Sequence, residues 1–159
     1  MLRALAVLAA LLAMQGAGFA SEPVCSGSLS GAVKARFRCS VSIAPGGDGA
    51  VVFEIRATDR LEGVPGYSPG AFELPAKAAV RTYTLDDLGM GRASVAAEGG
   101  TLFTASKTSS QRGEVTIVLK SVTTDPNVKG GYVAHGTYRA RLLPVGGGKE
   151  GEVVVEVSF

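Results

Sequence analysis

A strict alternation of apolar and polar residues over 34–43 constrains the fold more than any other feature of the chain. In this segment, KARFRCSVSI, apolar side chains occupy every second position, and Lys, Arg and Ser residues lie between them. A period of two places the two sets on opposite faces of a β-strand whose apolar face is buried. The turn sequence PGGDG follows at 45–49, and residues 50–57 alternate again. The two segments are therefore predicted to form an antiparallel hairpin.

Short segments of the same character recur along the rest of the chain. Strands are expected at 80–85, 93–97 and 101–106, with one helical turn at 86–90. The pattern of a strand, a polar turn, Gly-Glu-Val and an apolar strand then occurs twice, which predicts hairpins of 101–106 with 113–122 and of 137–143 with 151–159. The 22 glycines and seven prolines suit the tight turns between short strands. About eight to ten strands follow, which predicts an all-β fold: a single antiparallel β-sandwich over residues 21–159, with a small barrel as the alternative.

The C-terminal hairpin can be predicted in most detail. Its inner-face partners are Tyr138, Ala140 and Leu142 on one strand and Val153, Val155 and Val157 on the other. Arg139 and Arg141 then share the outer face with Glu152 and Glu156, where opposite charges stabilise cross-strand pairs. The final segment is apolar on one face and half-apolar on the other, so we expect it to lie between two neighbouring strands.

Residues 58–79 interrupt the strand pattern. They contain three prolines and three glycines, so irregular chain is expected there, with one short strand at 72–74. Loops of this kind often carry binding residues. Tyr67, an aromatic residue in this loop, is therefore the first candidate for contacting a ligand, with Ser68 beside it. Three residues of the C-terminal hairpin form the second group of ligand-binding candidates: His135, Arg139 and Arg141.

Residues 1–20 have the features of a secretory signal peptide. Arg3 precedes an Ala- and Leu-rich run that ends in small residues at Ala20. Export to the periplasm of a bacterium or to the medium is therefore expected. An even number of cysteines in an oxidising compartment favours a disulfide, so Cys25 and Cys39 are predicted to pair and to join the N-terminal segment to the first long strand. No second apolar run is long enough to cross a bilayer as a helix.

One motif suggests an enzyme. GYSPG at 66–70 fits the nucleophile-elbow pattern, and the order of Ser68 and His135 along the chain is that of a hydrolase. Pro69, however, has no N–H to offer an oxyanion. The chain is therefore predicted to be non-enzymatic, with a Ser68/His135 hydrolase as a remote alternative. His135 is the only histidine, and no ligand spacing or nucleotide-binding context accompanies it, so neither a metal nor a cofactor is predicted.

The charge of the chain bears on its partners. Sixteen basic residues against fourteen acidic ones give no reason to expect nucleic acid or an anionic membrane as a partner. A basic stripe of Lys34, Arg36 and Arg38 lies on the outer face of the first hairpin. It is either a solvated face or a surface for a sulfated or phosphorylated polymer. The prediction is a binding or structural module whose partner is an unknown protein or glycan.

The last nine residues, GEVVVEVSF, suggest a membrane alternative. Valine occupies every second position before the terminal Phe159. This arrangement resembles the C-terminal signal strand of bacterial outer-membrane β-barrel proteins, and the resemblance implies a small outer-membrane barrel as the alternative function. Only six Phe, four Tyr and no Trp are present, whereas such barrels carry aromatic girdles.

Overall fold

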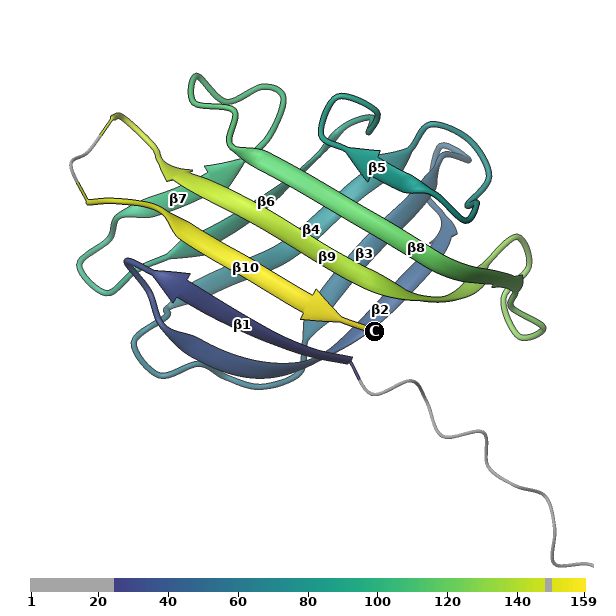
Figure 1. Ribbon diagram of the computed structural model, residues 1–159, viewed down its shortest axis with the longest axis horizontal. Coiled ribbons are helices and arrows are strands. Elements are labelled where there is room, and N and C mark those ends of the chain that lie inside the picture. The colour runs from purple at the N-terminus through teal and green to yellow at the C-terminus, as the bar shows by residue number, and fades with distance from the viewer. Residues whose placement is uncertain (1–24, 148–149) are drawn as a thin grey trace, which may run out of the picture.

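The computed structural model describes residues 25–147 and 150–159, so the expected signal peptide at 1–20 lies outside the described residues. Ten strands and no helix occur in the described ranges (Figure 1). The strands are β1 (Cys25–Gly31), β2 (Ala35–Pro45), β3 (Val51–Ala57), β4 (Gly66–Leu74), β5 (Thr82–Thr84), β6 (Gly91–Ala96), β7 (Leu102–Ala105), β8 (Glu114–Thr124), β9 (Tyr132–Pro144) and β10 (Val153–Ser158). Within the same ranges, no helix has the length and hydropathy needed to span a membrane.

Eight of the strands close into a barrel. Neighbouring strands follow the order β10-β1-β2-β3-β4-β6-β7-β9, and β9 pairs with β10 to complete the ring. Every pairing is antiparallel, and β8 and β5 continue the sheet outside the ring from the edge of β9. The predicted all-β antiparallel fold is therefore confirmed, in the closed form that the sequence left as the alternative to a sandwich.

The barrel is flattened into two layers whose strands cross. In Figure 1, β1, β10, β9, β8 and β5 lie in front, and β3, β4, β6 and β7 lie behind them. Apolar side chains fill the space between the layers, and Phe53 and Phe72 are both 0% exposed. The Phe53 ring lies 6.0 Å from the ring of Tyr138 and 5.6 Å from that of Phe159. The core therefore joins strands from both layers and from both halves of the chain.

Alternation sets the registers of the first and last hairpins. The first hairpin forms as predicted, with Ile43 opposite Phe53 and Val41 opposite Ile55. The inner-face partners of the C-terminal hairpin are also confirmed, with the pairs Val153–Leu142, Val155–Ala140 and Val157–Tyr138. The last strand, β10, lies between β1 and β9, as expected from its two apolar faces.

The predicted hairpin of 101–106 with 113–122 is wrong. β7 pairs with β6 and β8 pairs with β9, and β7 and β8 do not pair with each other. The chain turns at Gly113, which has a φ of +64° and whose added Cβ would lie 2.5 Å from the carbonyl oxygen of Arg141. Glycine thus lets the chain pass close to β9. The long β9 then offers one edge to β8 over 132–141 and to β7 over 143–144.

Two further expectations are corrected within residues 58–90. The expected irregular chain forms β4 from Gly66 to Leu74, far longer than the short strand predicted at 72–74. Pro69 is tolerated there because the register shifts between Ser68 and Ala71, and a bulge needs no ladder hydrogen bond from every residue. The single helical turn predicted at 86–90 lies earlier, at 85–87, where the amides of Asp87 and Leu88 donate to the Thr84 carbonyl at 2.9 and 3.2 Å.

The predicted disulfide is confirmed. Cys25 on β1 and Cys39 on β2 are direct cross-strand partners, with Cα atoms 4.9 Å apart, and the structure joins their sulfurs. No free cysteine remains in the part of the chain that the structure describes. The bond ties β1 to the first long strand, as the sequence indicated.

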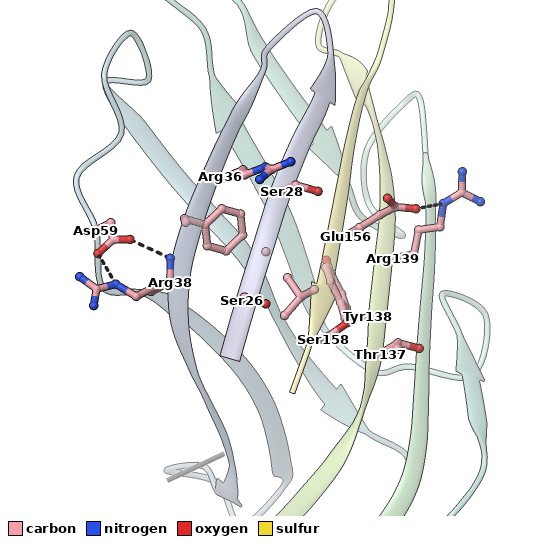
Figure 2. Close-up of a pocket in the computed structure, with 13 residues that line it drawn as sticks. Ser26, Ser28, Arg36, Arg38, Asp59, Thr137, Tyr138, Arg139, Glu156 and Ser158 are labelled. Carbon is pink, nitrogen blue, oxygen red and sulfur yellow. Dashed lines mark hydrogen bonds and ion pairs between the residues drawn. The ribbon is translucent and has the colours of Figure 1, made fainter. Parts of the chain in front are cut away.

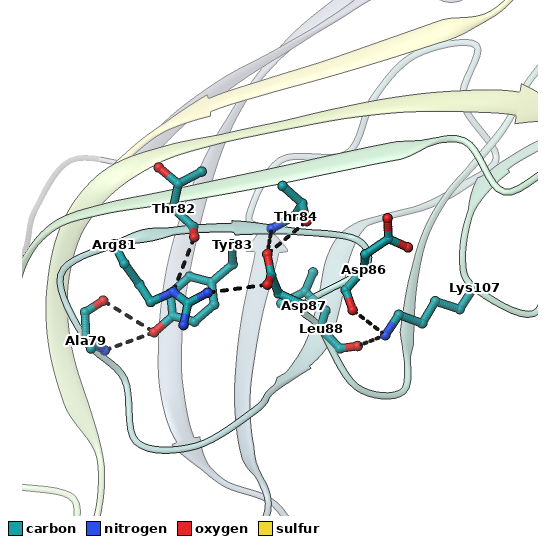
Figure 3. Close-up of polar contacts among 9 residues, drawn as sticks. All are labelled: Ala79, Arg81, Thr82, Tyr83, Thr84, Asp86, Asp87, Leu88 and Lys107. Carbon is teal, nitrogen blue, oxygen red and sulfur yellow. Dashed lines mark hydrogen bonds and ion pairs between the residues drawn. The ribbon is translucent and has the colours of Figure 1, made fainter.

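Polar contacts fasten the short strand β5 and the turn that follows it (Figure 3). Lys107 Nζ donates to the carbonyl oxygens of Asp86 and Leu88. Arg81 lies 4.7 Å above the ring of Tyr83 and forms an ion pair with Asp87 at 3.3 Å. These contacts hold the buried side chains of the segment, Tyr83, Leu85 and Leu88, against the core.

Asp87→Asn is expected to lower the free energy of unfolding at neutral pH. The amide and hydroxyl groups of Thr84 donate to the Asp87 carboxylate, each at 2.8 Å, and lower its pKa below the ordinary 3.8. A lowered pKa stabilises the fold above the unfolded-state value, and this contribution is lost as the pH falls through the folded-state pKa. Urea denaturation of both proteins from about pH 7 to about pH 2 should show their difference shrinking below about pH 4. A difference that stays constant over this range would contradict the role of the charge.

Candidate functional site

Tyr67, the first ligand-binding candidate, is a strand residue with structural contacts. Its ring packs edge-on against Phe37, with centroids 5.8 Å apart, and its hydroxyl donates to the carbonyl oxygen of Asp59 at 2.6 Å. Burial raises the pKa of the Tyr67 phenol, and the negative charge of Asp59 adds to the effect. Tyr67 borders an open hollow of about 780 Å³ between residues 58–67 and 97–100. The hydroxyl is therefore already engaged by the protein.

Ser68 and His135 lie on strands of different layers. Ser68 is half-buried on β4 opposite Ser94, beside the bulge. His135 is exposed on β9. The pairing of β8 with β9 has a register shift next to it, between Leu119 and Ser121 on β8. Within the described ranges, no hydrogen bond joins the Ser68 and His135 side chains. The structure therefore does not bring the two residues of the hydrolase alternative together.

Arg141 is held between two carboxylates on the outer face. Its guanidinium donates to Glu152 next to β10 and to Glu114 on β8, with the Glu114 bond at 3.2 Å. The hydrogen bond to Glu152 is the main reason why the pKa of Arg141 is raised. Arg139, two residues earlier, forms an ion pair with Glu156 at 3.4 Å. The outer-face charge pairing predicted for this hairpin is confirmed, and Glu114 is an added partner.

A trench on the outer face contains several of the charged residues singled out above. It has a volume of about 810 Å³ and crosses β1 at Ser26, Gly27 and Ser28, with β2 on one side and β10 and β9 on the other (Figure 2). Its polar lining consists of Ser26, Ser28, Arg36, Arg38, Asp59, Thr137, Arg139, Glu156 and Ser158. We call this surface the β1 trench. It places Arg139, a predicted ligand-binding residue, opposite two arginines of the predicted basic stripe.

The trench exists because β1 carries small side chains between strands with long ones. Outward positions of β1 hold Ser26 and Ser28, and Gly27 between them faces inward. A Cβ added to Gly27 would lie 2.3 Å from the Phe37 ring, so glycine leaves room for that ring beneath the trench floor. In Figure 2 the Arg36 side chain extends toward Ser28 on β1, whereas the Arg38 guanidinium lies on the other side of β2, next to Asp59.

The charges in the trench are mixed. Arg38 is paired with Asp59 at 3.5 Å, although its side chain is 80% exposed. Arg139 is paired with Glu156, and Arg36 has no ion pair among the described residues. The residues that line the trench therefore include three arginines and two acidic residues besides the serines and the threonine. Such a set can bind anionic groups through charge-assisted hydrogen bonds and can bind hydroxyl groups through its serines and carboxylates.

The sequence predicts the arginines on both sides of this site but not the serines of β1 between them. The basic stripe and Arg139 were both identified, but nothing in the sequence placed β1 between them. One local signal was present: the segment CSGSLSG at 25–31 alternates serine with less polar residues, as an exposed strand face does. Within the described residues, no cluster of His, Cys, Asp or Glu side chains could hold a metal ion.

No protein-family model matches the chain, and the searches of curated proteins and of solved structures return no significant match.

Proposed function

We propose that this protein is an exported, non-enzymatic binding module that holds an anionic ligand in the β1 trench. One observation carries the proposal: the fold gathers arginines from β2 and β9, about a hundred residues apart in sequence, around one hydroxyl-lined floor. Arginine is the side chain best suited to planar or tetrahedral anions, because its donors form a fixed fork. Arg36 supplies a guanidinium group with no ion pair among the described residues.

Export is supported by two independent features. The disulfide between Cys25 and Cys39 is of the kind that persists in oxidising compartments, and residues 1–20 carry the signal-peptide pattern. The outer-membrane alternative requires an apolar band facing outward. Here the outward positions of β2 carry arginine and serine, those of β9 include Arg139 and Arg141, and the Phe159 ring packs inward against Phe53. The polar outward positions and the inward packing of Phe159 favour a protein whose outer surface faces water and not lipid.

Arg36→Gln and Arg139→Gln are each expected to weaken binding of an anionic polymer about tenfold or more, since each removes a charge-assisted hydrogen bond. The measurement is fluorescence anisotropy of the mature protein with labelled polygalacturonate, dextran sulfate and polyphosphate. Arg92→Gln is the matched control, because Arg92 is an exposed strand arginine on β6 in the other layer. Binding of none of the three polymers, or equal binding by all three variants, would contradict the proposal.

A further inference from the structure

We propose that the ligand of the β1 trench is a linear polysaccharide bearing carboxylate groups, lying across β1 from β2 to β9. This inference rests on the proposed function and names its ligand class. The carboxylates of the polymer meet the arginines on the two sides of the trench, and its hydroxyl groups meet the serines and the acidic side chains. Shape, the pattern of polar groups and the lack of a stacking surface support it in turn.

The shape of the trench fits an extended chain. Only three residues of β1 line the trench, Ser26, Gly27 and Ser28, which at strand spacing corresponds to a length of about 10 Å along the strand. From β2 to β9 there are three inter-strand steps, so the arginine-bearing strands are about 14 Å apart. The trench is open along its length, unlike the enclosed pockets that bury most of a small ligand. A short segment of a polymer that lies across the strands can reach the arginine-bearing strands on both sides of the trench.

The polar groups form two rows across the strands. The first row is Arg38, Ser26, Ser158 and Thr137, and the second is Arg36, Ser28, Glu156 and Arg139. Each row has a cation on the β2 side and hydroxyl groups within it, and the second adds a carboxylate and another cation. A sugar acid has the complementary set, because its carboxylate accepts from guanidinium groups while its hydroxyl groups donate to Glu156 and exchange hydrogen bonds with serine.

The same pattern disfavours nucleic acid and polyphosphate. Both present a dense row of negative charge, which Asp59 and Glu156 in the trench would repel. Single-stranded nucleic acid also relies on aromatic platforms for its bases. The two aromatic residues at the trench, Phe37 and Tyr138, face inward and are only 3% and 1% exposed. A polymer with sparser charge and many hydroxyl groups matches the trench better.

Titration calorimetry of the mature protein with three defined probes tests the inference. The probes are hexagalacturonate, its fully methyl-esterified form and a linear polyphosphate of similar charge. Hexagalacturonate is expected to bind at least tenfold more tightly than either of the others. The ester has the same hydroxyl groups without charge, and polyphosphate has the charge without hydroxyl groups.

Two variants separate specific recognition from general attraction of anions. Arg36→Lys keeps the charge but loses the forked donor geometry, so it should weaken hexagalacturonate binding about tenfold while changing polyphosphate binding little. Ser28→Ala removes one hydroxyl group from the floor and should weaken hexagalacturonate alone. Arg92→Lys serves as the control, and all three proteins should keep the wild-type unfolding midpoint.

The failures of the inference and of the proposed function are distinguishable. If polyphosphate binds through Arg36 and Arg139 as tightly as hexagalacturonate, the trench is an anion site and the polysaccharide inference is overturned. If the methyl ester binds as tightly as the acid, the carboxylate has no role and the inference is likewise overturned. If none of the three probes binds, both the polysaccharide inference and the proposed function are overturned.

Discussion

Tyr138→Phe is expected to lower the free energy of unfolding by about 1–3 kcal/mol, the cost of leaving a buried polar group without its partner. Tyr138 is 1% exposed, and its hydroxyl donates to the carbonyl oxygen of Pro69 at 2.6 Å. This hydrogen bond joins β9 in one layer to the bulge of β4 in the other. Tyr138→Ala is expected to cost more, about 3–5 kcal/mol, because it also removes a ring from the core beside Phe53.

Urea denaturation followed by circular dichroism measures both losses. Tyr132→Phe is the matched control: Tyr132 lies on the same strand, is half-buried, and its hydroxyl makes no hydrogen bond within the described ranges. It should change the unfolding free energy little. If Tyr138→Phe and Tyr132→Phe were equally stable, the hydrogen bond to Pro69 would contribute nothing.

Tyr138 also predicts a response to alkaline pH. Burial raises the pKa of its phenol well above the ordinary value of 10.0. The unfolded chain therefore releases this proton more easily than the folded one, so stability is retained below about pH 10 and declines as the pH rises above it. In Tyr138→Phe this component of the alkaline decline should be missing.

Replacing both cysteines by serine is expected to lower the free energy of unfolding by about 3 kcal/mol, the chain-entropy value for a loop of about 15 residues. The two cysteines are 14 residues apart in sequence. The loss bears most on β1, because Cys25 and Leu29 are its only buried side chains. Without the bond, β1 depends on its backbone ladders with β2 and β10 and on Leu29.

Guanidinium denaturation with and without a thiol reductant measures this loss. Reductant should destabilise the wild-type protein to the level of the double variant and leave the variant itself unchanged. Anionic polymers should bind more weakly to the reduced protein, because β1 forms the floor of the trench. A reduced protein with the wild-type unfolding midpoint would show that the disulfide is dispensable for the fold.

Strands with strict alternation could be predicted from the sequence, and those whose pairing depends on distant residues could not. The period-two segments around Phe37, Phe53 and Val155 yield correct faces, and the C-terminal hairpin also the correct register, because one face of each is buried and a slip of one residue would expose it. β4 was missed because Pro69 and Gly70 read as loop residues. Glycine is needed at position 70 because a Cβ there would lie only 2.6 Å from the hydroxyl oxygen of Tyr138.

The candidate site, too, could be predicted from the sequence only in part. Outer-face positions such as Arg36 and Arg139 follow from alternation within each hairpin, but the contact between the hairpins is made by β1, whose sequence CSGSLSG carries little apolar signal. Tyr67 lies among proline and glycine residues, which predicts a loop residue that can contact a ligand. In the structure its hydroxyl donates to the carbonyl oxygen of Asp59. Which aromatic residues are free to meet a ligand depends on tertiary contacts that no local pattern encodes.

The pairing of β1 with β10 sets the order in which the molecule can be assembled. These are the first and last strands of the described chain, and they are neighbours in the ring. A chain emerging from its N-terminus, from a ribosome or through a translocation channel, cannot complete the ring until the final strand has been delivered. Closure by such distant segments is characteristic of folding on the millisecond-to-second timescale. Until then the edge of β1 that faces β10 has no partner strand.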